Sequence, residues 1–305
     1  MSGSPCHIHT QLFDGRAVNS GRAKFWIREF VHGYGDVRVI DRAVRSIFDC
    51  GYARVTLSDV QAQLLHGALS KCREFFAMPI ENKMRHASGD FNFGYRPMGR
   101  EYSSTVDRPD LNDCFTLWSD RTDLITHSEE IESLTTAMLR WRDCAAEVVG
   151  DVGAAIAHQF SGALPPFRAA SHLQVNHYRA TKFDRDLLQD CHEDGNLMTV
   201  IHADAPGLEL LVDGRPVPAE TCRDEIILMP GSVLQDLTGG RIAPLDHCVR
   251  NLQQGERTSM MYFVNPELND PVFPWVYHES MPAPDLRDRI RGNPSAYGLP
   301  DVPVL

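Results

Sequence analysis

A histidine and an aspartate near the middle of the chain could bind one metal ion together. His192 and Asp194 are separated by a single residue, and on an extended segment two such side chains point to the same side. A third ligand is available in His247, which follows the apolar run 225–229. Two histidines and one carboxylate on one face of a metal leave positions open for substrate and dioxygen, as in non-haem iron(II) sites. The three residues are therefore predicted to bind iron(II).

Arginine and serine follow His247 in a second polar pair. Arg257 and Ser259 share a face of the predicted strand 257–264, which continues as an apolar run. A guanidinium in an apolar strand is costly unless a carboxylate meets it, and arginine binds a carboxylate through two parallel hydrogen bonds. The pair could hold the distal carboxylate of 2-oxoglutarate or the carboxylate of a substrate.

Competing interpretations use the same residue types. A second H-x-D pair, His202 and Asp204, lies ten residues after the first, so the motif alone does not identify the ligands. A zinc hydrolase could use two histidines and an aspartate as well, but it needs a general base, and Glu193 should point away from the metal. The sequence contains neither a glycine-rich nucleotide motif nor a G-x-S-x-G nucleophile elbow.

The order and spacing of these residues resemble the isopenicillin N synthase family, which includes many 2-oxoglutarate-dependent iron(II) oxygenases. The resemblance covers about 39–266 and is strongest over 174–266, and the segment 234–240 is also similar to bacterial ethylene-forming enzyme. The residues that carry it are His192-Glu193-Asp194, Leu197, Thr199-Val200, Gly231-Ser232, Leu237-Thr238, His247-x-Val249 and Glu256-Arg257-x-Ser259. It implies that iron is bound by His192, Asp194 and His247 and that 2-oxoglutarate is held by Arg257, Ser259, Tyr178 and Asn176.

The same resemblance implies a function. The expected activity is oxidation, specifically hydroxylation, of a small amino-acid-derived or natural-product substrate. Iron(II) is the expected cofactor, and 2-oxoglutarate is the cosubstrate that is consumed with dioxygen to give succinate and CO2. Two alternatives stay open: an oxidase that uses dioxygen without 2-oxoglutarate, which Ser232 favours because many oxoglutarate users have aspartate there, and a non-catalytic metal-binding jelly-roll protein. The residues expected to contact substrate are Tyr95, Arg96, Arg100 and Phe263.

Composition narrows the class of protein and its surroundings. The net charge of −11 argues against nucleic acid as a partner, since phosphate binding needs clustered lysine and arginine. No apolar run approaches the roughly 18 residues of a membrane helix, and the first residues lack the apolar core of a signal peptide. The eight cysteines are scattered without a C-x-x-C pair, so reduced thiols in the cytoplasm are expected. Cys191 and Cys248, each beside a predicted ligand, are interpreted as packing residues.

The elements that must position these residues form a mainly β fold with flanking helices. The expected architecture is a double-stranded β-helix (jelly roll), in which an α/β region, 1–100, packs on a core, 101–305. In the first region a strand at 37–40, a helix at 41–50 and a strand at 52–57 precede a helix that starts at the capping box of Ser58. A long helix from Ser128 supports the core, a short one at 284–292 is expected over the barrel mouth, and Asp213-Gly214 is expected to form a hairpin turn. The core strands are predicted at 113–118, 172–178, 197–201, 208–212, 225–229, 241–249 and 257–264.

Overall fold

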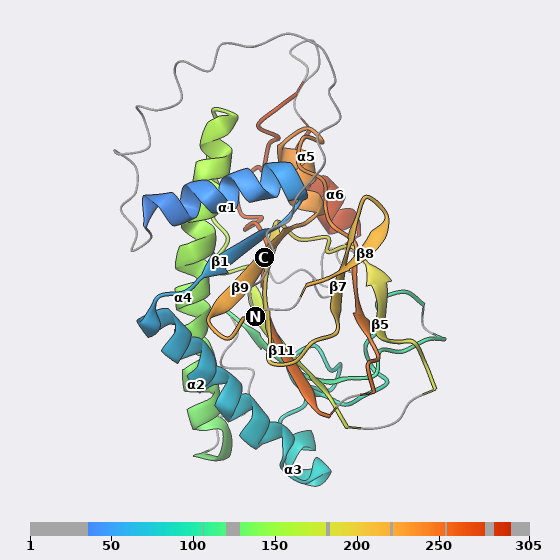
Figure 1. Cartoon of the computed structure of the whole chain (residues 1–305). Coiled ribbons are helices and arrows are strands. Elements are labelled where there is room, and N and C mark those ends of the chain that lie inside the picture. The colour runs from blue at the N-terminus through green and yellow to red at the C-terminus, as the bar shows by residue number, and fades with distance from the viewer. Residues whose placement is uncertain are drawn as a thin grey trace.

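Two antiparallel sheets lie opposite each other in the computed structural model, which describes residues 36–105, 107–119, 129–180, 184–219, 222–253, 255–277 and 284–293 (Figure 1). The larger sheet has seven strands in the order β1-β9-β6-β11-β4-β3-β2, and the smaller has four in the order β5-β10-β7-β8. The larger sheet consists of β1 Ala53–Thr56, β9 Glu225–Pro230, β6 Met198–Ala203, β11 Arg257–Val264, β4 His172–Tyr178, β3 Asp113–Trp118 and β2 Gly94–Arg96. The smaller consists of β5 Leu187–His192, β10 His247–Arg250, β7 Leu208–Val212 and β8 Arg215–Pro218. The predicted jelly-roll class is confirmed.

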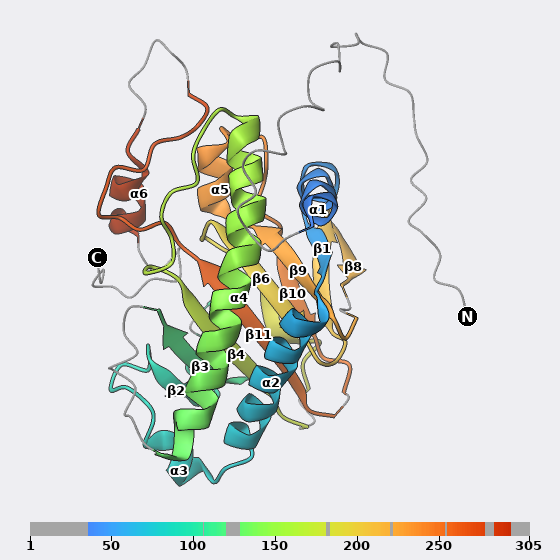
Figure 2. The same cartoon turned by 90° about the vertical axis from the view of Figure 1, so that its left-hand side faces the viewer.

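Three helices cover the outer face of the larger sheet: α1 Val37–Cys50, α2 Asp59–Phe76 and α4 Glu129–Gln159 (Figure 2). Shorter helices are α3 Ile80–Met84, α5 Ser232–Leu237 and α6 Leu286–Gly292. The predicted capping box of α2 is present, because the Ser58 side chain accepts from the Gln61 N–H and the Gln61 side chain accepts from the Ser58 N–H. Within the described residues no helix is apolar and long enough to cross a membrane.

Alternation along the strands separates a packed core from a cavity. On β4, Leu173 and Val175 belong to the apolar core under the helices, whereas His172, Gln174 and Asn176 line a cavity between the sheets. Residues two apart on a strand face the same side, and β11 shows the same alternation. A smaller apolar cluster, which includes Ile201, Leu210 and Met261, packs between the two sheets. The helices therefore stabilise one face of the larger sheet and leave the other for ligands.

Several predicted elements are correct. The strand over 52–57 appears as β1, and the long helix α4 runs for 31 residues without a break at either Gly150 or Gly153. A Cβ at Gly153 would lie 2.9 Å from Leu164, so glycine there permits close packing. The predicted hairpin joins β7 and β8, and Asp213 and Gly214 have φ of 51° and 70°, as a type I′ turn requires.

Other predicted elements are wrong. The segment 37–40 is helical, because the Asp36 side chain caps the first turn and Ile40 continues the buried face of α1. The strand predicted at 241–249 begins only at His247. β2, β5 and β8 were not predicted. β8 is fully exposed and β5 is mostly half-buried, so neither of these two strands shows a clear alternation of apolar and polar residues.

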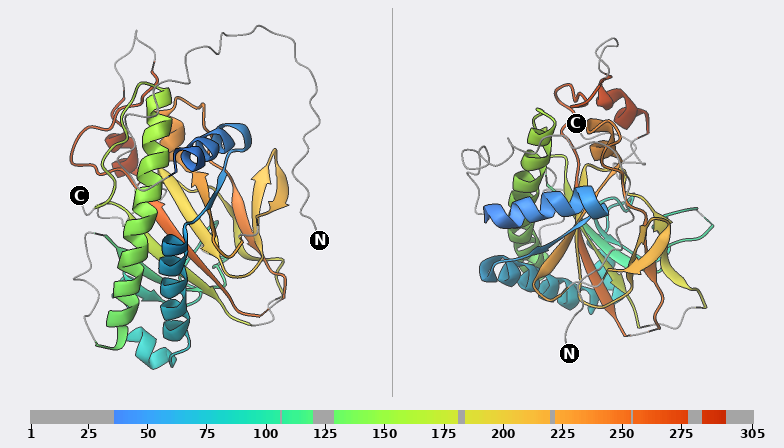
Figure 3. Two further views of the ribbon diagram at one scale, coloured as in Figure 1. Left: turned by 60° about the vertical axis from the view of Figure 1, so that its left-hand side comes forward. Right: turned by 45° about the horizontal axis from the view of Figure 1, so that its top comes forward.

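The C-terminal helix α6 does not lie over the barrel mouth. Its Arg289 pairs with Asp236 of α5, and none of its residues lines the cavity. Leu286 and Ile290 of α6 join the core under the helices, which explains why the helix packs at that end of the fold. Figure 3 shows α6 beside α5 at one end of the fold.

Seven of the eight cysteines lie in the part of the chain that the structure describes. These seven are free. Cys248 is buried as predicted, but Cys191 is exposed, because it lies on the outer side of an edge strand. Thiol counting on denatured protein prepared without oxidation is expected to find all eight thiols free. Two or more native disulfides would contradict that prediction.

Candidate metal centre and adjoining cavity

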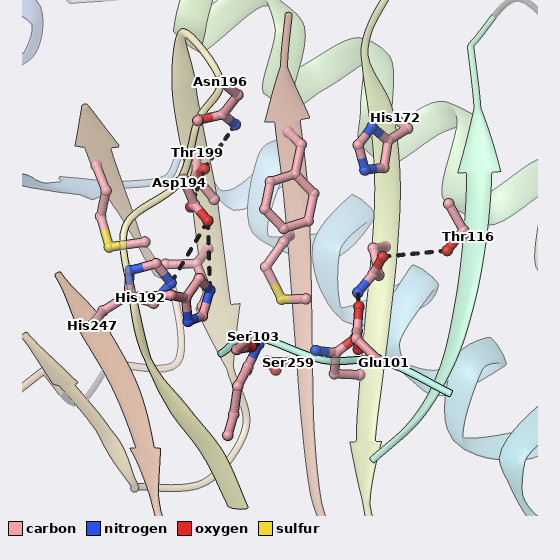
Figure 4. A pocket seen from close by; sticks show the side chains of 18 of the residues that line it. Glu101, Ser103, Thr116, His172, His192, Asp194, Asn196, Thr199, His247 and Ser259 are labelled. Carbon is pink, nitrogen blue, oxygen red and sulfur yellow. Dashed lines mark hydrogen bonds and ion pairs between the residues drawn. The ribbon is translucent and has the colours of Figure 1, made fainter. Parts of the chain in front are cut away.

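Strand pairing in the smaller sheet brings the predicted ligands together. His192 ends β5, His247 begins β10, and the two are direct partners in the antiparallel pairing, with ring centroids 4.4 Å apart. Asp194 follows β5, and its Oδ1 lies 3.7 Å from Nε2 of His192 and 3.9 Å from Nε2 of His247 (Figure 4). One ligand atom from each residue lies within 4.8 Å of the others, and among the described residues this is the one such group.

Backbone carbonyls orient both imidazoles. Nδ1 of His192 lies 2.9 Å from the carbonyl oxygen of Asp190, and Nδ1 of His247 lies 3.3 Å from that of Leu245. A carbonyl only accepts, so each Nδ1 carries the proton and each Nε2 presents a lone pair toward Asp194. Burial lowers the pKa of His247, opposed by the nearby Asp194 carboxylate. Two imidazole nitrogens and a carboxylate oxygen are ligands that fit a divalent metal ion.

A short chain of hydrogen bonds holds the carboxylate of Asp194. Its Oδ2 accepts from Oγ1 of Thr199 at 2.6 Å, and that oxygen accepts from Nδ2 of Asn196 at 2.9 Å. This leaves Oδ1 directed at the two imidazoles. Thr199 and Asn196 were not predicted as site residues, although Thr199 is among the residues that carry the family resemblance.

The neighbouring Gly231 and Ser232 position the same loop. A Cβ on Gly231 would lie 2.2 Å from the carbonyl oxygen of Asn196, so only glycine fits there. Oγ of Ser232 donates to Oε1 of Glu193 at 2.9 Å. Glu193 is therefore hydrogen-bonded to Ser232, which is not one of the predicted metal ligands.

Replacing Thr199 with valine should weaken metal binding. The substitution keeps the shape of the side chain but removes the hydrogen bond to Asp194, and loss of such supporting contacts typically costs about 10- to 100-fold in metal affinity. Anaerobic iron(II) titration would measure it. Thr116→Val is the matched control, since Thr116 lines the same cavity but bonds to Gln174. Equal iron affinity in wild type and Thr199→Val would contradict the role given to Thr199.

Arg257 is buried beside the other predicted oxoacid contacts. Its Nη1 donates to Oγ of Ser259 at 3.1 Å, its Nε donates to the carbonyl of Ala205 at 3.2 Å, and its guanidinium lies 5.1 Å from the ring centroid of Tyr178. Its Nη2 is buried without a hydrogen-bond partner among the described residues. A buried charged donor with a free N–H fits an incoming carboxylate. The Tyr178 hydroxyl donates to Gln189 at 2.8 Å.

The cavity has a volume of about 410 Å3. Its floor is the inner face of the larger sheet, where residues that pair across neighbouring strands form rows. The first row runs Met229, Thr199, Phe263, His172, Trp118, and the second runs Ile201, Met261, Gln174, Thr116. Ser259 and Asn176 lie in the third row, and Arg257 pairs with Tyr178 in the fourth. Ser259 and Asn176 line the cavity, whereas Arg257 and Tyr178 lie one pair beyond and do not line it. Arg257 is joined to the cavity wall by its hydrogen bond to Ser259. The clamp and the first row thus occupy opposite ends of β4 and β11.

The residues expected to contact substrate divide into two pairs. Arg96 and Phe263 line the cavity, whereas Tyr95 and Arg100 do not. Tyr95 is fully buried, and its hydroxyl donates to Asp113 at 2.7 Å. The guanidinium of Arg100 lies over the ring of Phe91. Tyr95 faces away because successive residues of β2 point to opposite sides of the sheet.

The second H-x-D pair has structural contacts. Nδ1 of His202 lies 2.7 Å from the carbonyl oxygen of Glu225, and Asp204 accepts from the Thr258 N–H at 2.7 Å and from Arg73 at 2.8 Å. These contacts tie β6 to β9, β11 and α2. Neither residue belongs to the ligand group or lines the cavity.

Two family models match the chain. The model for the non-haem dioxygenase in morphine synthesis N-terminal domain matches residues 35–137, and that for the 2OG-Fe(II) oxygenase superfamily matches 170–266. The second range contains all three candidate ligands and the clamp. The jelly roll and the His-Asp-His group define a class of non-haem iron proteins, and the chain belongs to the isopenicillin N synthase-like 2OG/Fe(II) oxygenase superfamily. The predicted family is therefore confirmed.

Curated relatives and solved structures are also similar to this chain. The chain is 29% identical over 153 residues to a 1-aminocyclopropane-1-carboxylate oxidase of Musa acuminata (48% of each protein), and 24% identical over 237 residues to gibberellin 2-beta-dioxygenase 6 of Oryza sativa subsp. japonica (73% of this chain, 65% of the relative). It thus spans about half of the first and less than two thirds of the second. Full-length Neurospora crassa T7H, solved with alpha-KG, superimposes with a TM-score of 0.70 at 17% identity, covering 85% of this chain and 93% of that one. The rice dioxygenase for auxin oxidation gives 0.66 at 20% identity, covering 87% and 92%. These two likenesses show the fold.

Proposed function

We propose that the protein is an iron(II)- and 2-oxoglutarate-dependent oxygenase that hydroxylates a small molecule. The observation that carries the proposal is the pairing of a preorganised His-Asp-His group with a buried arginine whose Nη2 has no partner in the described structure. Family membership supports both cofactors. The 410 Å3 cavity lies at the small end of the range for ligand sites, about 300–1,000 Å3, and must hold the oxoacid as well as the substrate.

Each residue has a role that its contacts explain. His192, Asp194 and His247 would hold iron(II), and Thr199 fixes the carboxylate that faces it. Arg257 would bind the distal carboxylate of 2-oxoglutarate, with Ser259 and Tyr178 beside it. When bound, iron(II) and 2-oxoglutarate supply the activation of dioxygen, with succinate and CO2 as by-products. The cavity walls place the substrate C–H bond and exclude water.

Ser232 does not decide between the oxygenase and the oxidase alternative. Ser232 favoured an oxidase only because it occupies a position where many oxoglutarate users have aspartate. Its hydroxyl donates to Glu193 and its backbone N–H donates to the carbonyl oxygen of Asp194 at 3.0 Å, so Ser232 positions the loop that carries Asp194, a role that fits either enzyme. The arginine clamp itself serves either interpretation, which makes oxoglutarate dependence the property to measure.

Succinate release measures that property directly. Protein loaded with iron(II) and given dioxygen and 2-oxoglutarate should release succinate slowly alone and faster with a true substrate, in step with product. Asp194→Ala is the matched inactive control. Oxidation of a substrate at full rate without 2-oxoglutarate would refute the proposal in favour of the oxidase.

A further inference from the structure

Three aromatic rings form a stack along the first row of the cavity floor. His172 of β4 pairs with Trp118 of β3 and Phe263 of β11, and its ring is stacked on both, at centroid distances of 4.3 and 5.0 Å. All three residues line the cavity. Because side chains stand roughly perpendicular to a sheet, rings stacked across strands direct their edges, and not their faces, into the cavity. The row therefore presents a polar imidazole edge between two apolar ring edges.

His172 is a buried polar group without a protein partner. Its side chain is 5% exposed, and its Nδ1 has no hydrogen-bond partner among the described residues. Burial, assisted by the charge of Arg96, lowers the pKa of His172 to about 3, so the imidazole is neutral and offers both a donor and an acceptor. Buried polar atoms in folded proteins nearly always have partners, which a ligand can supply here. Figure 4 shows His172 across the cavity from Asp194.

The wall beside this row carries no net charge. Arg96 is the one lysine or arginine among the described lining residues, and its Nη1 donates to Oε1 of Glu101 at 3.2 Å. The same carboxylate accepts from Gln174 at 2.6 Å and from Asn112 at 2.7 Å. An anionic substrate would meet the Glu101 carboxylate together with Arg96, and so would gain little from the cation. This wall therefore favours a neutral ligand.

The aromatic row lies far from Arg257 and Tyr178, whereas Arg96 lies in the third row with Asn176 and Ser259. His172 and Tyr178 are the first and last residues of β4, so six steps along the strand separate them by about 20 Å. In contrast, Thr199, whose hydroxyl donates a hydrogen bond to Asp194, lies only two strands from His172 in the first row. A molecule held by His172 would thus lie toward the metal group and away from Arg257.

We propose that the aromatic row and the Arg96–Glu101 pair form the substrate-binding wall and select a neutral, planar, hydrogen-bonding molecule, amide- or lactam-like, over a carboxylate. His172 is the residue that determines this specificity by hydrogen bonding to the substrate. This inference rests on the proposed function, because it assigns the substrate class of the same site.

Benzamide and benzoate form a matched probe pair, since they have the same size and planarity and differ in charge. Their binding would be measured by anaerobic calorimetry on full-length protein loaded with iron(II) and 2-oxoglutarate. Benzamide should bind at least about fivefold more tightly than benzoate, and His172→Phe should weaken benzamide about fivefold, the usual value of one hydrogen bond. Phenylalanine keeps the stack, and His66→Phe, on the surface of α2, is the control that should change nothing.

A second substitution tests the charge argument independently. Glu101→Gln leaves Arg96 without its carboxylate, so benzoate should gain affinity while benzamide changes little. Preference for benzoate in the wild type, no saturable benzamide binding, or equal benzamide affinity in wild type and His172→Phe would each overturn the inference. Titration of 2-oxoglutarate in the same samples separates the two proposals: the affinity for the oxoacid should be the same in His172→Phe, whereas failure of the wild type to bind it would instead refute the proposed function.

Discussion

Replacing His192, Asp194 or His247 with alanine should each abolish stoichiometric iron(II) binding. The three donor atoms lie within 4.8 Å of one another, and two remaining protein ligands hold a catalytic metal poorly because the facial arrangement needs all three. Anaerobic titration of purified protein with iron(II), followed by metal analysis after desalting, would measure the stoichiometry. We expect close to one iron per wild-type chain and none retained by the variants.

His202→Ala is the control for this prediction, since His202 lies in the second H-x-D pair and contacts the backbone of Glu225. The variant should keep its iron even if it is less stable. Thermal unfolding in the absence of metal would separate a loss of stability from a loss of ligands. Iron lost in His202→Ala and retained in His192→Ala would show that the assignment is wrong.

Arg257→Ala should weaken 2-oxoglutarate binding by roughly 2–5 kcal/mol, about 30-fold to several thousandfold. Arg257 is 4% exposed and its Nη2 has no partner in the described structure, so its loss would leave the distal carboxylate buried without a cation. Arg257→Lys should restore only part of the affinity, because an ammonium group cannot present two parallel N–H donors. Equilibrium titration of the iron(II)-loaded variants under anaerobic conditions would give the dissociation constants.

Arg179→Ala provides the comparison for a neighbouring arginine. Arg179 follows Tyr178 on the chain but pairs with Asp113, so its loss should leave oxoglutarate affinity within a few-fold of the wild type. If Arg257→Ala binds 2-oxoglutarate as tightly as the wild type, Arg257 does not hold the oxoacid, and the prediction is wrong.

The metal group was predictable because local spacing and long-range order agreed. His192 and Asp194 point the same way from one short segment, and the family resemblance located His247 on a strand that proved to be the direct partner of β5. Thr199 and Asn196 were missed, since a threonine on a strand and an asparagine in a turn have no distinctive spacing. Their role depends on how the loop after β5 folds back onto β6.

The substrate wall was the least predictable part of the site. Trp118, His172 and Phe263 come from three strands that are distant in sequence, and only the register of the larger sheet places them in one row. The helix α1 was partly mistaken for a strand because Val37 and Val39 are β-branched, whereas the Asp36 cap and the buried face with Ile40 determine the helix. Local propensity gave way to tertiary packing there.

Anaerobic titration of iron(II)-loaded protein with 2-oxoglutarate tests the central claim most directly. Chelation of iron(II) by the oxoacid should produce a weak visible charge-transfer band that saturates at one 2-oxoglutarate per iron, shifts to higher concentrations in Arg257→Ala and is absent in Asp194→Ala. Iron bound at full stoichiometry with no such band and no saturable binding of 2-oxoglutarate would contradict the assignment of this site as an oxoglutarate-dependent iron centre.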